Sequence, residues 1–209
     1  MCLSIIIKNN NKRGYVFTMR IITGKAKGVN LKTLEGDTTR PTSERVKEAV
    51  FSMLQFDIEG RRVLDLFAGS GQMGLEALSR GADSAVLIDK SADAVKIIQE
   101  NALKCKLYPS CEIRRFDYLD YIKRNRGEKF DIIFLDPPYA LKFYAPALRN
   151  LLDCNMLKPS SLIVCESGEE EIFDGDSELA DKYVIFKQSR YSRSYITILM
   201  PNKEGDKDE

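Results

Sequence analysis

The sequence predicts an α/β fold, an open sheet of about seven strands with helices on both faces. Short apolar runs alternate with longer stretches whose apolar residues recur at helical spacing, which is typical of parallel strands joined by crossover helices. Two more β-like runs lie close together near the C-terminus and indicate an antiparallel hairpin. The chain has 209 residues, 44% hydrophobic and 30% charged, which is the composition of one medium globular domain.

The first expected elements are a small β-hairpin at about 20–34 and a helix that opens at 41–44 and runs to about Gln55, capped by Thr42 or Ser43. Strands are expected at 62–67, 85–88, 112–116, 130–135, 162–165, 183–187 and 195–200, and helices at 73–80, 92–104, 119–126 and 144–152. The chain is therefore divided into an extension at 1–18, either disordered or the product of a misplaced start, an N-terminal hairpin and helix at 19–60, the main domain at 61–200 and a polar tail at 201–209.

The composition excludes several kinds of chemistry. The chain has no histidine, so Ser-His-Asp catalysis, Cys-His catalysis and the HExxH zinc motif are ruled out. Its five cysteines include no C-x-x-C pair, so neither a disulfide framework nor a metal site is expected, and the cytoplasm is the expected compartment. No apolar run approaches the roughly 18 residues that span a bilayer, so no membrane partner is expected.

Charge is balanced in total but unevenly distributed. Lys and Arg number 32 against 31 Asp and Glu, a net charge of +1, and the chain as a whole lacks the basicity of a general polyanion binder. The first 34 residues carry seven bases and no acid, whereas 166–181 carries eight acids and no base. We expect the acidic segment to be a solvated loop or helix.

A glycine-rich turn joins the first predicted strand to its helix. Gly69, Gly71 and Gly74 fit G-x-G-x-x-G, a pattern that allows a tight turn and lets a nucleoside cofactor approach the helix N-terminus. Asp89 ends the next strand, 18 residues after Gly71, where it can accept hydrogen bonds from ribose hydroxyls. This pairing fits NAD or S-adenosylmethionine, and a turn that serves packing alone is the plainer alternative.

The segment Asp136-Pro137-Pro138-Tyr139 directly follows the apolar strand at 130–135. The prolines hold the backbone extended and donate no N–H, so an acid, a carbonyl and an aromatic ring stand together at the end of a strand. Asp136 and the Pro137 carbonyl can accept the two N–H groups of an exocyclic amine while Tyr139 stacks on the base. This set favours methyl transfer to an amine, and a loop that only ends the strand is the alternative.

From Met19 to about Met200 the chain resembles the class I S-adenosylmethionine-dependent methyltransferases, and within them the bacterial 16S rRNA guanine-N2 methyltransferases of the RsmD type. The resemblance is carried by 19–24 (MRIITG), 39–51 (TRPTSERVKEAVF), 65–71 with 74–82 (GLEALSRGA), and 136–139 (DPPY). It implies a Rossmann-like sheet, S-adenosylmethionine as cofactor, and a monomer that acts on 16S rRNA or on an assembly intermediate of the small subunit.

The resemblance also implies residue roles. Asp136, Pro137 and Tyr139 would hold a guanine flipped from its stack. The cofactor site would consist of Asp65, Phe67, Gly69, Gly71, Asp89 and Asp117, of which Asp89 binds the ribose and Asp117 the adenine amino group, with Phe116 or Tyr118 beside the ring. RNA would contact Arg20, Lys25, Arg40, Thr42 and Arg45, although Arg40 and Thr42 also suit the cofactor carboxylate. A second RNA contact is expected at Lys123, Arg124 and Arg126.

The sequence departs from the family at three places. Residues 1–18 have no counterpart, Gln72-Met73 replaces smaller residues after the glycines, and 189–194 lacks the Tyr-Gly pair expected before the last strand. Other functions stay open. An adenine-N6 methyltransferase would use D-P-P-Y equally but usually carries an added target-reading domain, an NAD-dependent oxidoreductase leaves D-P-P-Y without a role, and a catalytically silent RNA-binding module has no need of it.

Overall fold

The computed structural model describes residues 19–34, 44–137 and 143–202. The helices in these ranges are α1 (Glu44–Met53), α2 (Gln72–Ser79), α3 (Ala92–Lys104), α4 (Tyr118–Arg124), α5 (Tyr144–Asp153) and α6 (Ser177–Ala180), with a 3-10 helix, η1 (Tyr108–Ser110). The strands are β1 (Arg62–Asp65), β2 (Ser84–Asp89), β3 (Cys111–Arg115), β4 (Phe130–Leu135), β5 (Leu157–Ser167), β6 (Tyr183–Tyr191) and β7 (Ser194–Pro201). Each strand predicted from the sequence overlaps one of these, so the predicted α/β sheet is confirmed.

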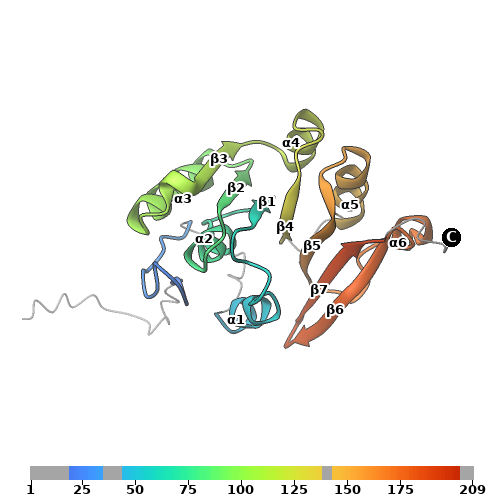
Figure 1. The fold of residues 1–209 in the computed structure, drawn as a ribbon, viewed down its shortest axis with the longest axis horizontal. Coiled ribbons are helices and arrows are strands. Elements are labelled where there is room, and N and C mark those ends of the chain that lie inside the picture. The colour runs from blue at the N-terminus through green and yellow to red at the C-terminus, as the bar shows by residue number, and fades with distance from the viewer. Residues whose placement is uncertain (1–18, 35–43, 138–142, 203–209) are drawn as a thin grey trace, which may run out of the picture.

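The seven strands of the described chain form one sheet in the order β3-β2-β1-β4-β5-β7-β6 (Figure 1). The first five of these run parallel, and β7 is antiparallel to both β5 and β6. From β1 the chain moves through β2 to β3, and then returns to the other side of β1 as β4. In open sheets of this kind, ligands bind outside the carboxyl ends of the strands where the strand order reverses. That point here lies between β1 and β4.

Alternation along the strands divides the core into two layers. Leu87 and Phe134 belong to the layer that packs against α1, α2 and α3. Their chain neighbours Ile88 and Leu135 belong to the opposite layer, with α4 and α5. Because successive strand residues point to opposite faces, an apolar residue at every position lets both faces be covered by helices.

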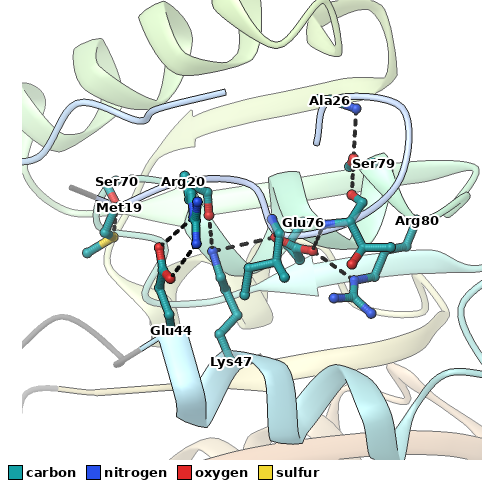
Figure 2. A network of polar contacts seen from close by, with 11 residues as sticks. Met19, Arg20, Ala26, Glu44, Lys47, Ser70, Glu76, Ser79 and Arg80 are labelled. Atoms are coloured by element: carbon teal, nitrogen blue, oxygen red, sulfur yellow. Dashed lines mark hydrogen bonds and ion pairs between the residues drawn. The ribbon is translucent and has the colours of Figure 1, made fainter. Parts of the chain in front are cut away.

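Residues 19–34, here called the N-terminal arm, lie over α2 (Figure 2). The small hairpin expected for this segment is present in a short form, with one isolated antiparallel bridge between Arg20 and Asn30. Backbone hydrogen bonds from Ile21 N to Val29 O and from Leu31 N to Met19 O also join its two sides, and other backbone N–H groups of the arm bond to α2. Glu76 receives two of them, and Ser79 Oγ receives the N–H of Ala26 at 2.9 Å. The cap expected from Thr42 or Ser43 lies outside the described residues.

The acidic segment 166–181 differs from the solvated loop or helix expected for it. Glu166 lies in β5 and is 7% exposed, because β5 continues to Ser167 and pairs there with β7. Ile172, Phe173 and Leu179 are also buried, in the layer that contains α5. The segment is therefore partly core, and most of its other acids are exposed on a short connection that includes α6.

The cysteines of the described ranges, Cys105, Cys111, Cys154 and Cys165, are free thiols. Within the same ranges no group of His, Cys, Asp or Glu side chains is arranged to hold a metal ion. None of the helices described above is long and apolar enough to cross a membrane.

Candidate active site

Three carboxylates lie at the carboxyl ends of neighbouring strands. Asp65 and Asp89 are the last residues of β1 and β2, and Asp136 directly follows β4. The register places these ends at one edge of the sheet, since Asp65 pairs with Leu87 of β2 and with Phe134 of β4. The acids singled out from the sequence therefore meet where the strand order reverses, which is where such sheets bind ligands.

The glycines of the turn between β1 and α2 have different roles. A Cβ on Gly69 would meet nothing within 4 Å, so the backbone there faces open space that a ligand can enter. Gly71 is the N-cap of α2 with φ +81°, a left-handed conformation that favours glycine. Gly74 lets α2 approach β2, because a Cβ would lie 2.8 Å from Leu87 Cδ2. The turn thus presents open backbone next to a helix N-terminus.

Asp89 holds this turn from the neighbouring strand. Its Oδ2 accepts the backbone N–H of Gly69 at 2.9 Å, and its Oδ1 accepts that of Ser91 at 2.8 Å. The residue is partly exposed. Each carboxylate oxygen has a further lone pair, so Asp89 can also accept hydrogen bonds from ligand hydroxyls. Asp89, the residue predicted to bind the cofactor ribose, therefore also holds the glycine turn in place.

Asp65 is 2% exposed, and its Oδ2 accepts the backbone N–H of Gly74 at 3.3 Å. Burial raises the pKa of Asp65 to about 7, and the neighbouring Asp89 carboxylate adds to the rise. A cationic group bound beside Asp65 would favour its ionised form. The place of Asp65 at the methionine end of the cofactor stays a prediction.

Aromatic rings gather just past the end of β1. The Phe67 centroid lies 4.9 Å from that of Tyr118 and 5.5 Å from that of Phe143, and the Tyr118 and Phe143 centroids are 5.4 Å apart. Phe116 packs separately, with its ring under the Arg124 guanidinium at 5.5 Å. Of the two rings proposed for the adenine, Tyr118 is therefore the one that joins Phe67.

Asp117 is exposed at the N-cap of α4, after β3. Its Oδ1 accepts the backbone N–H of Leu119 at 2.9 Å. Capping of α4 is by itself a sufficient reason for an aspartate at this position. The predicted contact with the adenine amino group would be a second role.

Asp136 and Pro137 follow β4, all six of whose residues are buried. Asp136 is partly buried and Pro137 is buried. A rigid central strand therefore fixes both at the same sheet edge as Asp65 and Asp89. Tyr139, the third residue predicted to hold the target base, lies outside the described residues.

Comparison with known proteins agrees with this geometry. Residues 19–200 match the family model described as Conserved hypothetical protein 95. The chain belongs to this family. Ribosomal RNA small subunit methyltransferase D of Haemophilus influenzae is 35% identical over 168 residues, 79% of this chain and 85% of that protein. The solved yhhF protein of Escherichia coli has a TM-score of 0.76 at 27% identity, covering 88% of this chain and 98% of its own.

A more distant structure, an RNA methyltransferase of Salinibacter ruber in complex with S-adenosyl-L-homocysteine, has a TM-score of 0.62 at 16% identity, over 81% of this chain and 98% of its own. At that identity the likeness concerns the fold alone. The comparisons confirm the RsmD-type family and the class I methyltransferase fold predicted from the sequence, and they agree with S-adenosylmethionine as the predicted cofactor.

The residues predicted to contact RNA that the structure describes lie on the N-terminal arm and on α1, and the arm contacts the glycine turn through Met19 Sδ, 3.7 Å from Ser70 Oγ. Arg20 is on the N-terminal arm, where its guanidinium pairs with Glu44 at 3.0 Å. Lys25 is exposed on the same arm, and its backbone N–H bonds to α2. Arg45 is exposed on α1. Arg40 and Thr42 lie outside the described residues.

Sequence reasoning missed three residues that organise the site. Glu76 anchors the arm on α2, and Phe143 completes the ring cluster. Asn101 of α3 is fully buried, and its Nδ2 donates to Ser70 O of the glycine turn at 2.9 Å and to Lys32 O of the arm at 3.0 Å. No local pattern marks Asn101 or Phe143, whereas Glu76 lies within the family run at 74–82, although the resemblance implies no role for it.

Proposed function

We propose that this protein transfers a methyl group from S-adenosylmethionine to the exocyclic N2 of a guanine in 16S rRNA. The observation that carries the proposal is the meeting of Asp65, Asp89 and Asp136 at the reversal point of the sheet. The name of the Haemophilus influenzae relative supports ribosomal RNA as the substrate. The choice of a guanine amine as the methyl acceptor rests on the resemblance to the RsmD type and on the chemistry of Asp136 and Pro137.

The residues at the turn fit a nucleoside cofactor with an amino-acid tail. Gly69 faces open space, Asp89 is partly exposed for ribose hydroxyls, and the buried Asp65 carboxylate suits an ammonium group. The ring cluster that begins at Phe67 offers an apolar surface for a planar base. When bound, S-adenosylmethionine supplies an electrophilic methyl group on its sulfonium.

Asp136 has the role of orienting the amine rather than of a strong base. Its carboxylate and the Pro137 carbonyl accept the two N–H groups, which pulls the nitrogen toward a pyramidal geometry and directs its lone pair at the methyl group. The proton leaves only after the new N–C bond has formed, when the nitrogen is cationic and strongly acidic. Positioning and the exclusion of water therefore supply most of the acceleration, and no imidazole is required.

The proposal includes that the protein acts in the cytoplasm as a monomer. Its substrate is either free 16S rRNA or 16S rRNA in an assembling small subunit. The N2 amine of a guanine can reach the site at Asp136 only when the base is unstacked and turned out. The substrate is therefore a base in a loop or bulge, or one flipped from its stack.

Transfer of tritiated methyl groups to transcribed small-subunit rRNA and to isolated subunits tests the proposal. Wild type should label the RNA, and Asp136→Ala should label none while its affinity for S-adenosylmethionine is unchanged. Asp93→Ala, which removes an exposed acid from the first turn of α3, is the matched control and should retain activity. Retained turnover in Asp136→Ala would exclude Asp136 from the reaction.

A further inference from the structure

The tip of the β6–β7 hairpin lies at the same edge of the sheet as Asp136. Leu135 of β4 pairs with Cys165 of β5, and two residues further along β5, Ser167 pairs with Tyr195 of β7. Tyr195 in turn pairs with Arg190 of β6. Arg190 is therefore level with the segment that follows β4. Three strand spacings separate β4 from β6, which is about 14 Å.

This hairpin carries positive charge with no acid of its own. Residues 183–201 contain Lys187, Arg190 and Arg193 and no Asp or Glu. All three bases are exposed, and none of them takes part in the ion pairs found among the described residues. The acidic segment reaches β6 through its backbone, because the Glu170 carbonyl accepts a hydrogen bond from Gln188 Nε2 at 3.1 Å.

Two of the bases are combined with aromatic rings. Lys187 Nζ lies 5.4 Å from the centroid of Phe186, and the Arg190 guanidinium carbon lies 5.4 Å from that of Tyr195. Phe186 is 48% exposed, an unusual fraction for a phenylalanine. Cations beside exposed rings are the combination that binds single-stranded nucleic acid, because the rings stack on bases while the cations meet phosphates.

We propose that the tip of this hairpin, with Arg190, Arg193 and Tyr195, binds the RNA strand that flanks the target nucleotide. The inference rests on the function proposed above and adds a substrate-binding surface to it. A separation of about 14 Å lets one RNA strand contact the hairpin and the site at Asp136 together. The hairpin then holds the strand while the site at Asp136 receives the turned-out base.

A second copy of the chain is the competing occupant, because Val184, Ile185 and Phe186 expose apolar surface on an edge strand. Two features disfavour pairing along this edge. The register shifts between Ile185 and Lys187, which marks a bulge, and Lys187 itself places a charge on the strand. The basic residues, moreover, extend to the tip, beyond the apolar run.

The test compares two double variants that each remove two exposed bases. Arg190→Ala/Arg193→Ala alters the hairpin, whereas Lys96→Ala/Lys106→Ala alters α3 and the segment just after it, at the opposite edge of the sheet, where α3 packs against β3. The probe is transcribed small-subunit rRNA, measured by filter binding between 50 and about 200 mM salt. The full-length protein is used throughout, with its unfolding temperature and its affinity for S-adenosylmethionine as folding controls.

The hairpin variant should bind the RNA roughly 10-fold more weakly, with the slope of log K against log salt reduced by about 1.4 for two lost phosphate contacts. The α3 variant should bind as wild type does, and both should keep cofactor affinity. The inference is overturned if the hairpin variant binds like wild type, or if light scattering shows a wild-type dimer that Phe186→Ser converts to a monomer. If wild-type protein methylates no small-subunit RNA, the proposed function fails instead, whatever the hairpin result.

Discussion

Lys47 Nζ lies 3.5 Å from Glu76 Oε2, and neither side chain is more than 1% exposed (Figure 2). Glu76 Oε1 also accepts Arg80 Nε at 2.8 Å, and its two oxygens receive the backbone N–H groups of Ile22 and Thr23 at 2.7 and 3.0 Å. Lys47 Nζ donates to the Arg20 carbonyl at 2.6 Å. One buried carboxylate thus joins α1, α2 and the N-terminal arm.

Replacement of Glu76 should destabilise the protein far more than replacement of Lys47. Glu76→Gln leaves a buried ammonium without its counter-charge, and we expect a loss of about 3–5 kcal/mol in the free energy of unfolding. Lys47→Met removes that ammonium, whose pKa burial already lowers, while Glu76 keeps Arg80 and two N–H donors. Urea unfolding of both variants tests this. Equal losses would contradict the claim that an unpaired Lys47 ammonium is the costly state.

The close contact of Gly24 with Ser79 supplies a matched pair of glycine variants. A Cβ on Gly24 would lie 1.8 Å from Ser79 O, and Gly24 also has φ +86°. Gly24→Ala should therefore cost about 3 kcal/mol or more in unfolding free energy. Gly28 has φ +82° with nothing within 4 Å of a Cβ, so Gly28→Ala should cost only about 1 kcal/mol. Similar losses in thermal unfolding would contradict the docking of the arm on α2.

Asp65 should make stability fall as pH rises through neutrality. In the unfolded chain it titrates near 3.8, and burial raises its folded-state pKa to about 7, so the folded protein binds the extra proton between these values. Stability from this group is therefore highest below pH 4 and declines up to about pH 7. Urea unfolding of Asp65→Asn and of wild type at pH 5 and at pH 8 tests this. From pH 5 to pH 8, the unfolding free energy of the variant should rise by about 2–3 kcal/mol relative to that of wild type. A constant difference would mean that Asp65 is ionised throughout.

Asp89 should govern cofactor affinity. Asp89→Ala removes the acceptor for ribose hydroxyls and also releases the Gly69 N–H, so affinity for S-adenosylmethionine should fall roughly 10- to 100-fold in calorimetry. Asp93→Ala, an exposed acid in the next helix, should leave the affinity unchanged. Unaltered binding by Asp89→Ala would remove this residue from the cofactor site.

Much of the sheet and of the site could be predicted because both follow from local patterns. Strands buried on two faces appear as continuous apolar runs, as at 130–135, and parallel topology then brings Asp65, Asp89 and Asp136 to one edge. The early part of β5 was missed because it is polar. Ser161 is held there by a hydrogen bond to the Phe130 carbonyl at 2.6 Å, a pairing that hydropathy does not reveal.

The docking of the arm could not be predicted for a different reason. The contact between Ile22 and Glu76 joins residues 54 positions apart, and Glu76 occupies a helix position where an exposed acid is equally common. In the same way Gln72, one of the residues noted as a departure from the family, proves to be buried. Its Oε1 is the one buried side-chain acceptor of the described chain without a hydrogen-bond partner.

Mass-spectrometric mapping of 16S rRNA from a strain that lacks this protein tests the central proposal most directly. We predict the loss of a single N2-methylguanine, restored by the wild-type chain and not by Asp136→Ala. An unchanged methylation profile in the deletion strain would contradict the proposal, and loss of an N6-methyladenine instead would assign the same site to the other exocyclic amine.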